Sequence, residues 1–275
     1  MYNISNKKIF IYFCEMFGSV NPLAYLYPMT NTKTHTMNKK PTGYIVYEGA
    51  SVLNGEPIVA VITTKSANIK TGNMAQLWIL RSDMHPIEAK EQGVDNAICG
   101  MCQFRQSLGG ACYVNIGQAP SAVYRTYNKG GYPIANDLSI FEGFKIRFGA
   151  YGDPAAIPVS ILATLKRYAK NNTSYTHQWK DNKDNDTLKA VSMASVDNLL
   201  EAEEAKKAGY RWFRVTNDIS TLREDEIICP NTTKGIQCAD CNLCSGNAVK
   251  AKSIVIESHG TWSKKFKEKK GLSLV

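Results

Sequence analysis

The sequence predicts an α/β protein with a β-rich N-terminal part, a partial (β/α) barrel-like C-terminal half and two cysteine-rich metal-binding loops. Beyond Phe141, short apolar runs alternate with amphipathic stretches, which is typical of right-handed parallel β-α units. Seven of the eight cysteines fall into two tight groups with spacings of three residues. Thiolates at that spacing converge on one ion or cluster, whereas disulfide partners are usually spread along the chain.

Four parts are expected: an extension at 1–36, a β-rich part with the first cysteine group at 37–140, a barrel-like part with the second group at 141–262, and a basic tail at 263–275. A polar linker precedes Met37, which is therefore an alternative start of the native protein, and the extension need not belong to it.

The β-rich part is expected to hold three strands and one short helix, at 43–47, 57–63, 74–80 and 85–93. Asn54-Gly55, a strong turn signal, joins the first two strands into a hairpin. The barrel-like part is expected to hold strands at 145–151, 174–179, 189–195, 211–216 and 253–258, with helices at 159–170 and 198–207.

Polar side chains follow each predicted strand of the barrel-like part, where ligands and catalytic groups collect in such folds. We therefore expect Asp153, His177 and Asp197 to line a substrate cavity as candidate catalytic residues. The other polar strand ends are Gln178, Ser195, Thr216, Asn217, Ser258 and His259. Taken singly, Asp197 is also typical of a helix N-cap and His177 of a structural histidine.

The second cysteine group consists of Cys229, Cys238, Cys241 and Cys244. Its last three members form a Cys-x2-Cys-x2-Cys run, which is more typical of an iron–sulfur cluster than of structural zinc. A Cys-Pro pair also accompanies ferredoxin-type runs, although here it precedes the run. The group predicts a closed four-thiolate site for a [4Fe-4S] cluster, with zinc as the alternative metal.

The first cysteine group, Cys99, Cys102 and Cys112, supplies only three thiolates. Three ligands and an open position are what a catalytic metal or cluster needs, since substrate must reach the ion. The fourth ligand stays open between Cys14, a histidine such as His85 and another molecule. The alternative is a zinc knuckle completed by a distant histidine or by water.

The net charge of +9, with lysines crowded near the C-terminus, favours polyanions and makes nucleic acid a candidate partner. No run approaches the roughly 20 apolar residues of a membrane span, so no membrane partner is expected. Clustered thiols without a recognisable export signal indicate a reducing cytoplasm.

Several short motifs resemble a family of uncharacterised proteins carried by bacteriophages and related mobile elements. They are Tyr47–Ser51, Lys70–Leu80, Cys99–Cys102, Cys112–Asn115, Gly149–Pro154, Tyr175–Trp179 and Gly235–Cys244. The resemblance spans about residues 40–262 and implies no activity, and it places the protein in the host cytoplasm.

A more distant resemblance is to radical SAM enzymes, which combine a partial or full β/α barrel with a three-cysteine [4Fe-4S] cluster whose open iron binds S-adenosylmethionine. Many of them carry a second, four-cysteine cluster, which would correspond to the second group here. The family's usual Cys-x3-Cys-x2-Cys loop is absent from this chain. The resemblance therefore carries over only Cys99, Cys102 and Cys112 as cluster ligands.

Two functions follow as expectations. The first is an iron–sulfur enzyme of radical SAM-like organisation that acts on a nucleic acid or a protein. The alternative is a non-catalytic zinc protein that binds nucleic acid or a host protein, with zinc bracing its loops. A third explanation, a disulfide-linked virion component, fits the three-residue cysteine spacing least.

Overall fold

The computed structural model describes residues 40–183, 185–259 and 263–266. The chain divides into two units, Met1–Lys39 and Lys40–Val275. The predicted extension 1–36 and Cys14 lie outside the described residues, as does most of the predicted basic tail.

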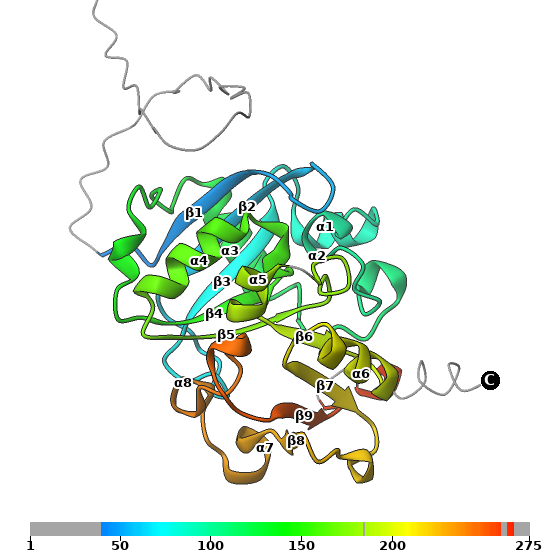
Figure 1. Ribbon diagram of the computed structural model, residues 1–275. Helices are drawn as coiled ribbons and strands as arrows, with labels where there is room; N and C mark the ends of the chain where they lie inside the picture. Colours follow the sequence, from blue (N-terminus) through cyan, green and yellow to red (C-terminus); the bar gives the residue numbers. More distant parts are fainter. Residues whose placement is uncertain (1–39, 184, 260–262, 267–275) are drawn as a thin grey trace, which may run out of the picture. The chain divides into compact units, whose positions relative to one another are not determined.

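The second unit is built on one nine-stranded sheet in the order β1-β2-β3-β4-β5-β6-β7-β9-β8 (Figure 1). Its strands are β1 (Gly43–Ala50), β2 (Pro57–Thr63), β3 (Ala75–Arg81), β4 (Lys145–Tyr151), β5 (Asn171–Thr176), β6 (Met193–Val196), β7 (Trp212–Thr216), β8 (Glu226–Ile228) and β9 (Ser253–Glu257). The predicted α/β class is confirmed. The predicted β-rich and barrel-like parts share this sheet, because β3 pairs with β4.

The first three strands are antiparallel, and every later pairing is parallel. The turn at Asn54-Gly55 joins β1 to β2 as predicted, with Gly43 opposite Thr63. From β3 to β7 the strand order follows the chain order. Right-handed crossovers that always step in one direction place their helices on one face of a sheet.

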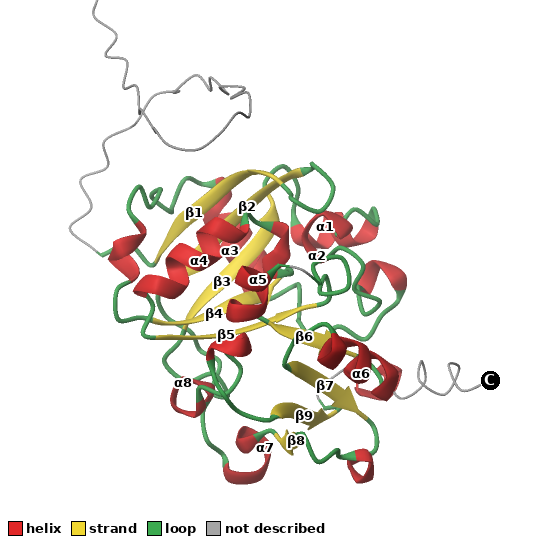
Figure 2. Cartoon of the chain, in the orientation of Figure 1, coloured by secondary structure: helices red, strands yellow, loops and turns green. Residues whose placement is uncertain are grey.

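Eight α-helices connect the described strands: α1 (Pro86–Glu91), α2 (Asn96–Cys99), α3 (Ala119–Asn128), α4 (Val159–Tyr168), α5 (Asp186–Val191), α6 (Leu199–Lys207), α7 (Pro230–Lys234) and α8 (Cys238–Cys241). Short 3-10 turns lie at Gln106–Leu108, Leu138–Phe141, Pro154–Ala156, Ile219–Thr221 and Gly246–Ala248. Figure 2 shows α4 and α5 over one face of the sheet.

The main core lies between these helices and the sheet. Leu162 and Leu165 of α4 are fully buried against Ile146 and Phe148 of β4. On the opposite face a smaller cluster of Met193, Ile254 and Cys244 packs with half-buried side chains that include Tyr175 and Phe213. The second cysteine group therefore covers part of the face that the main helices leave bare.

Two predicted strands are wrong in position. The strand expected at 174–179 is β5 at Asn171–Thr176, and part of the one expected at 189–195 belongs to α5. Asn172 is buried inside β5 because its side chain donates to Val191 O at 2.8 Å and accepts from Lys166 Nζ at 2.7 Å. Two consecutive asparagines are typical of a turn. They can lie in a buried strand here because residues distant in the sequence satisfy their side-chain amides. The sequence also missed α3 and β8.

Candidate functional site

Three neighbouring parallel strands end at one edge of the sheet and bring the predicted catalytic residues together. Asp153 follows β4, His177 follows β5 and Asp197 follows β6. The Asp153 carboxylate accepts the backbone N–H of His177 at 2.8 Å, and Asp197 Oδ1 lies 3.5 Å from His177 Nε2. The residues therefore form one polar cluster.

Asp153 has a positioning role within that cluster. Its carboxylate is 7% exposed and also accepts Thr176 Oγ1 at 2.7 Å and the backbone N–H of Ala155 at 3.0 Å. Burial raises the pKa of this carboxyl although the hydrogen bonds oppose the shift. Asp153 thus fixes the chain at the end of β5 and caps the turn at Pro154–Ala156.

The His177 ring lies between a carboxylate and a thiol. Its Nε2 is 3.5 Å from Asp197 Oδ1 and 4.0 Å from Cys102 Sγ, while Gln103 donates to Asp197 Oδ2 at 2.6 Å. Burial lowers the pKa of the ring, but Cys102 and Asp197 outweigh it, so the pKa lies well above its usual value.

The first cysteine group is docked onto this cluster by Gln178. The Gln178 side chain donates to Cys99 O at 3.1 Å and accepts the backbone N–H of Met101 at 3.3 Å. Gly100 has φ 51°, and a Cβ there would lie 2.4 Å from Gln178 Oε1. The glycine inside Cys99-Gly-Met-Cys102 is therefore required by this close approach.

The three thiols of the first group are neighbours. Burial raises the pKa of Cys99 well above its usual value, and the Cys102 and Cys112 thiolates raise it further. Burial likewise raises the pKa of Cys112 to about 11, again with a contribution from Cys102. Three ionised thiols would repel one another here, so a bound cation is what would favour the thiolate forms.

A buried brace and two unpaired polar atoms lie beside these thiols. Asp95 accepts Arg105 at 2.9 Å and Ser107 at 2.6 Å. The Arg105 Nε and the Tyr151 hydroxyl are both buried, and neither has a hydrogen-bond partner among the described residues. Tyr151 interacts with Cys99 and Cys112. Sequence reasoning missed Tyr151 because a tyrosine that ends an apolar strand is usually a core residue.

No group of three or more His, Cys, Asp or Glu side chains within 40–183, 185–259 and 263–266 is arranged to hold a metal ion as it stands. The composition of the first group still fits a thiophilic metal, with three neighbouring thiols and an imidazole at their edge. The buried Tyr151 hydroxyl is a hydrogen-bond donor without an acceptor among the described residues. The residues therefore fit a metal or cluster.

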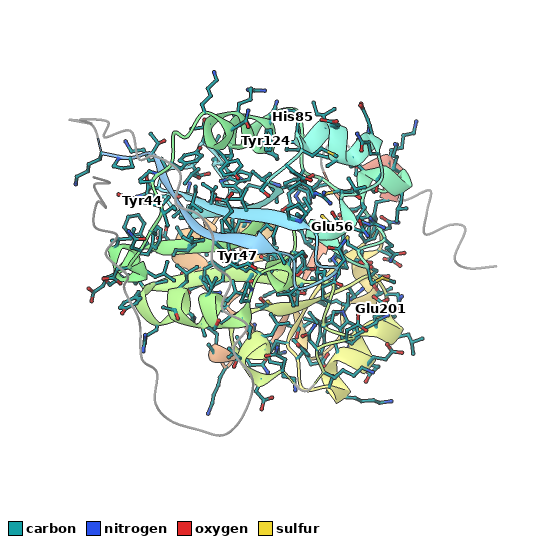
Figure 3. All side chains as sticks on the ribbon, turned by 90° about the horizontal axis from the view of Figure 1, so that it is seen from above. Tyr44, Tyr47, Glu56, His85, Tyr124 and Glu201 are labelled. Carbon is teal, nitrogen blue, oxygen red and sulfur yellow. The ribbon has the colours of Figure 1, made fainter. Side chains whose placement is uncertain are left out.

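The structure distinguishes between the histidines considered as fourth ligand. His85 caps α1 by accepting the backbone N–H of Ile87 at 3.3 Å, and its ring packs against Tyr124 with centroids 5.4 Å apart (Figure 3). His177, by contrast, lies beside Cys102. The histidine beside the first group is thus His177, and Cys14 is outside the described part of the chain.

The remaining predicted strand-end residues form other contacts. Ser258 Oγ donates to Asn217 Oδ1 at 2.8 Å, and the Ser258 N–H donates to Thr216 O at 2.8 Å. The Ser195 carbonyl accepts Trp179 Nε1 at 2.9 Å. His259 contacts Glu257 O at 2.9 Å. These contacts link neighbouring strand ends and are structural.

The second cysteine group extends across the sheet. The backbone N–H of Cys238 donates to Lys70 O at 3.0 Å, just ahead of β3. Lys145, the first residue of β4, pairs with Asp240 at 3.1 Å. Cys229 follows the carboxyl end of β8, and Cys244 O accepts the backbone N–H of Ser174, inside β5, at 3.0 Å. The group therefore reaches from the amino ends of β3 and β4 over the face that carries Tyr175.

All four thiols of the second group interact with one another. Burial raises the pKa of Cys244 to about 12, and Cys229, Cys238 and Cys241 contribute to the rise. The Tyr175 side chain packs against Cys244 and opposes the shift in its pKa. The loop that carries these thiols is held by the Arg211 guanidinium, which donates to the carbonyls of Leu243, Gly246, Ala251 and Lys252.

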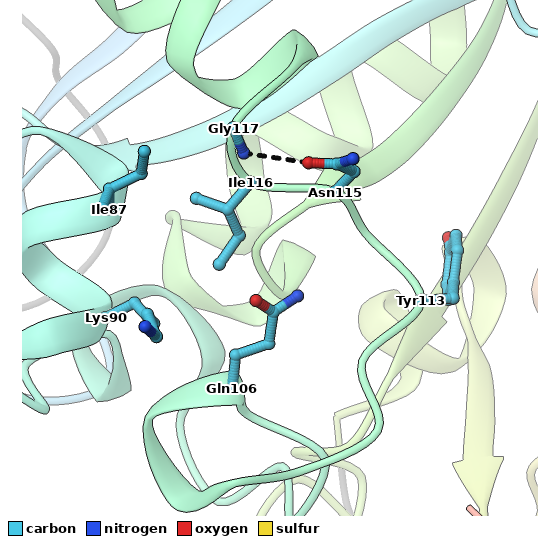
Figure 4. Close-up of a pocket in the computed structure, with 7 residues that line it drawn as sticks. All are labelled: Ile87, Lys90, Gln106, Tyr113, Asn115, Ile116 and Gly117. Carbon is cyan, nitrogen blue, oxygen red and sulfur yellow. Dashed lines mark hydrogen bonds between the residues drawn. The ribbon is translucent and has the colours of Figure 1, made fainter. Parts of the chain in front are cut away.

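A small pocket borders the segment that follows Cys112 (Figure 4). Its lining residues are Ile87, Lys90, Gln106, Tyr113, Asn115, Ile116 and Gly117. Gln106 donates to Val114 O at 2.6 Å and holds this segment, and Asn115 accepts the backbone N–H of Gly117 at 3.1 Å. The pocket contains no cysteine, histidine or carboxylate, so it is separate from the candidate site.

None of the helices in the described part of the chain has the length and apolar character needed to cross a membrane. Comparisons with family models, curated proteins and solved structures found no match to this chain.

Proposed function

We propose that this chain is an iron–sulfur enzyme of radical SAM-like organisation that acts on a nucleic acid or a protein. One observation carries the proposal: the first cysteine group follows β3, the first strand of the parallel series, and lies at the carboxyl ends of β4 to β6. Reactive groups collect at that edge in β/α folds.

In this proposal Cys99, Cys102 and Cys112 hold a [4Fe-4S] cluster with one open iron. When bound, the cluster supplies a binding place for S-adenosylmethionine and the electron for its reductive cleavage. His177 and Asp197 form the polar border of the site, and Asp153 holds His177 in place. Cys229, Cys238, Cys241 and Cys244 hold an auxiliary cluster over the face of the sheet that carries Tyr175 and Phe213.

The arrangement of the sheet supports a partial-barrel organisation. The strand order runs in one direction from β3 to β7, as in the parallel β-α units of a partial barrel. Helices α4 and α5 lie over one face of these strands. Tyr175 and Phe213 lie on the other face, with ring centroids 4.5 Å apart, and the second cysteine group packs over them.

Metal analysis of the full chain, purified without oxygen, tests the proposal. We expect iron and sulfide for about two four-iron clusters per chain, a brown visible spectrum and reductive cleavage of S-adenosylmethionine. Colourless protein with one or two zinc ions per chain would contradict it.

A zinc protein is the second candidate, and the position of His177 favours it. With Nε2 4.0 Å from Cys102 Sγ, this histidine offers a fourth ligand for a Cys3His zinc site. Zinc at both groups would stabilise the loops, and the lysines near the C-terminus would bind nucleic acid with a steep dependence on salt.

His177→Ala separates the two candidates. A Cys3His zinc site would lose about one zinc per chain, because its fourth ligand is gone. In the iron–sulfur enzyme the variant keeps its iron and sulfide, since the three thiolates still hold the cluster. His85→Ala is the matched control, because His85 lies at α1 and both candidates predict unchanged metal content.

The proposed chemistry requires a reducing compartment, which we place in the host cytoplasm in keeping with the resemblance to phage proteins. Growth in an infected host, followed by fractionation of the tagged protein, tests that location. Recovery in an oxidising compartment with the thiols paired would contradict it.

A further inference from the structure

A hollow lined by basic residues lies where β7, β9 and β8 begin. Its volume is about 450 Å³, and its lining residues are Lys206, Arg211, Trp212, Asp225, Lys250, Ala251, Lys252 and Ser253. Arg211 and Lys252 directly precede β7 and β9, and Lys206 belongs to the last turn of α6. Cations from 206–211 and from 250–252 therefore meet around this basic hollow.

The Arg211 guanidinium fixes the backbone at one side of the basic hollow. It donates to Ala251 O and to Lys252 O, each at 2.7 Å, and the Arg211 backbone N–H donates to Asn247 Oδ1 at 2.9 Å. All the hydrogen bonds that the described residues give this guanidinium go to neutral backbone carbonyls, which leave its positive charge in place. Lys250 and Lys252 are thus carried by a fixed segment.

Positive charge exceeds negative charge in the basic hollow. Among the described residues that line it, four are cations and Asp225 is the one carboxylate. Asp225 is already paired, because it accepts Lys206 Nζ at 2.7 Å and Arg223 Nε at 2.9 Å. Lys250 and Lys252 are both exposed. Cations held close together repel one another, so an anion that bridges them is favoured.

The lining of the basic hollow suits the phosphates of a nucleic-acid strand better than a membrane surface. Lysine ammonium groups bind phosphates as point charges. A helix that lies on a membrane needs apolar side chains that enter the lipid, whereas the described apolar residues of this lining are Ala251 and Trp212, which is 3% exposed. A positively charged groove that follows the backbone is typical of proteins that bind single strands.

We propose that the basic hollow binds backbone phosphates of a single-stranded nucleic acid through Lys250 and Lys252, with Lys206 and Arg211 adding to the positive potential. In naming the partner, the inference rests on the proposed function, which leaves nucleic acid and protein open. The hollow itself requires no metal, so its occupant can be tested apart from the metal content.

Binding of a fluorescent oligothymidylate to the full chain at several salt concentrations tests the inference. Each lysine that neutralises a phosphate contributes about 0.7 to the slope of log affinity against log salt concentration for single strands. Lys250→Gln combined with Lys252→Gln should therefore reduce the slope by about 1.4 and weaken binding about 25-fold at ~0.1 M salt. Lys250→Arg combined with Lys252→Arg keeps both charges and should bind as wild type does.

Lys65→Gln combined with Lys129→Gln is the matched control. Both lysines are exposed, follow β2 and α3 and do not line the basic hollow, so the control removes the same net charge elsewhere. Its salt slope should equal that of wild type. Equal losses in the control and in the Lys250 and Lys252 glutamine variant would show that net charge alone attracts the strand, and would overturn the inference. Wild-type protein that binds no oligothymidylate would overturn it as well.

Two further measurements identify the source of the phosphate and separate the inference from the proposed function. Thymidine monophosphate should displace the oligomer weakly, because it offers one phosphate; equal displacement at equal phosphate concentration would assign the hollow to a small molecule and overturn the inference. Iron and sulfide are determined on the same samples. Loaded protein whose binding does not depend on Lys250 and Lys252 would overturn the inference alone, and dependent binding by protein without iron would overturn the proposed function alone.

Discussion

At the scale of single residues, Arg214 of β7 and Glu226 of β8 form a buried charged pair. The guanidinium donates to both carboxylate oxygens, at 2.8 and 2.6 Å, and Trp212 Nε1 donates to the same carboxylate at 2.8 Å. The side chains are 3% and 0% exposed. The pair spans β9 and joins the last three strands of the sheet.

Glu226→Gln should lower the free energy of unfolding by about 3 kcal/mol, because it leaves the Arg214 charge buried without a counter-ion. Urea unfolding at pH 7 measures the change. Glu224→Gln is the control: this neighbouring carboxylate is exposed, so its loss should change stability by less than about 0.5 kcal/mol. Equal effects of the two variants would show that burial of the pair contributes nothing.

Because of this pair, the stability of the protein should also depend on pH. Burial raises the pKa of Glu226, but the donors Arg214 and Trp212 outweigh it, and the pKa falls below the usual 4.5. Stability from a lowered carboxyl pKa is present above pH 4.5 and is lost as the pH falls through the lowered value. The difference between wild type and Glu226→Gln should therefore shrink below about pH 4.5, which urea unfolding at successive pH values measures.

At the scale of elements, α6 begins directly behind the candidate site. The Asn198 side chain accepts the backbone N–H of Glu201 at 2.8 Å, and the Glu201 carboxylate accepts that of Asp197 at 2.7 Å. These reciprocal bonds resemble a capping box. They fix the backbone that carries Asp197, so the start of this helix also sets the position of His177.

Asn198→Ala should cost about 1 kcal/mol of stability, because it removes the N-cap acceptor of α6. Asn198→Ser keeps an acceptor and should restore most of the loss. Thermal unfolding of the two variants and wild type gives the comparison. If the alanine and serine variants are equally destabilised, the capping bond does not support the helix.

At the scale of the whole molecule, the two cysteine groups lie on different parts of one sheet and should differ in their importance for folding. Cys241→Ala should lose one metal centre and much of the fold, because the loop from 229 to 244 packs over the face formed by Tyr175 and Phe213. Cys99→Ala should lose the other centre while the protein stays folded. Metal content and circular dichroism of both variants measure this, and a folded Cys241→Ala variant would contradict it.

Much of the architecture could be predicted from the sequence because it depends on local patterns. Alternating apolar residues predicted β2 and β4 with their exact bounds, and Asn54-Gly55 predicted the hairpin. The strand-end rule also predicted that Asp153, His177 and Asp197 would lie at one edge of the sheet. The cysteine spacing predicted two metal-binding groups, and this stays a prediction.

The tertiary structure decided what depends on contacts between distant segments. It made Asn171 and Asn172 the first residues of β5, because Lys166, Val191 and Ser245 form hydrogen bonds with their buried side-chain amides. It set His177 beside Cys102, 75 positions away in the chain. The spacing of residues in the sequence determines which of them can share a loop or a helix. Only tertiary packing determines which loops come together. The candidate site forms where three strand ends meet the loop of the first cysteine group.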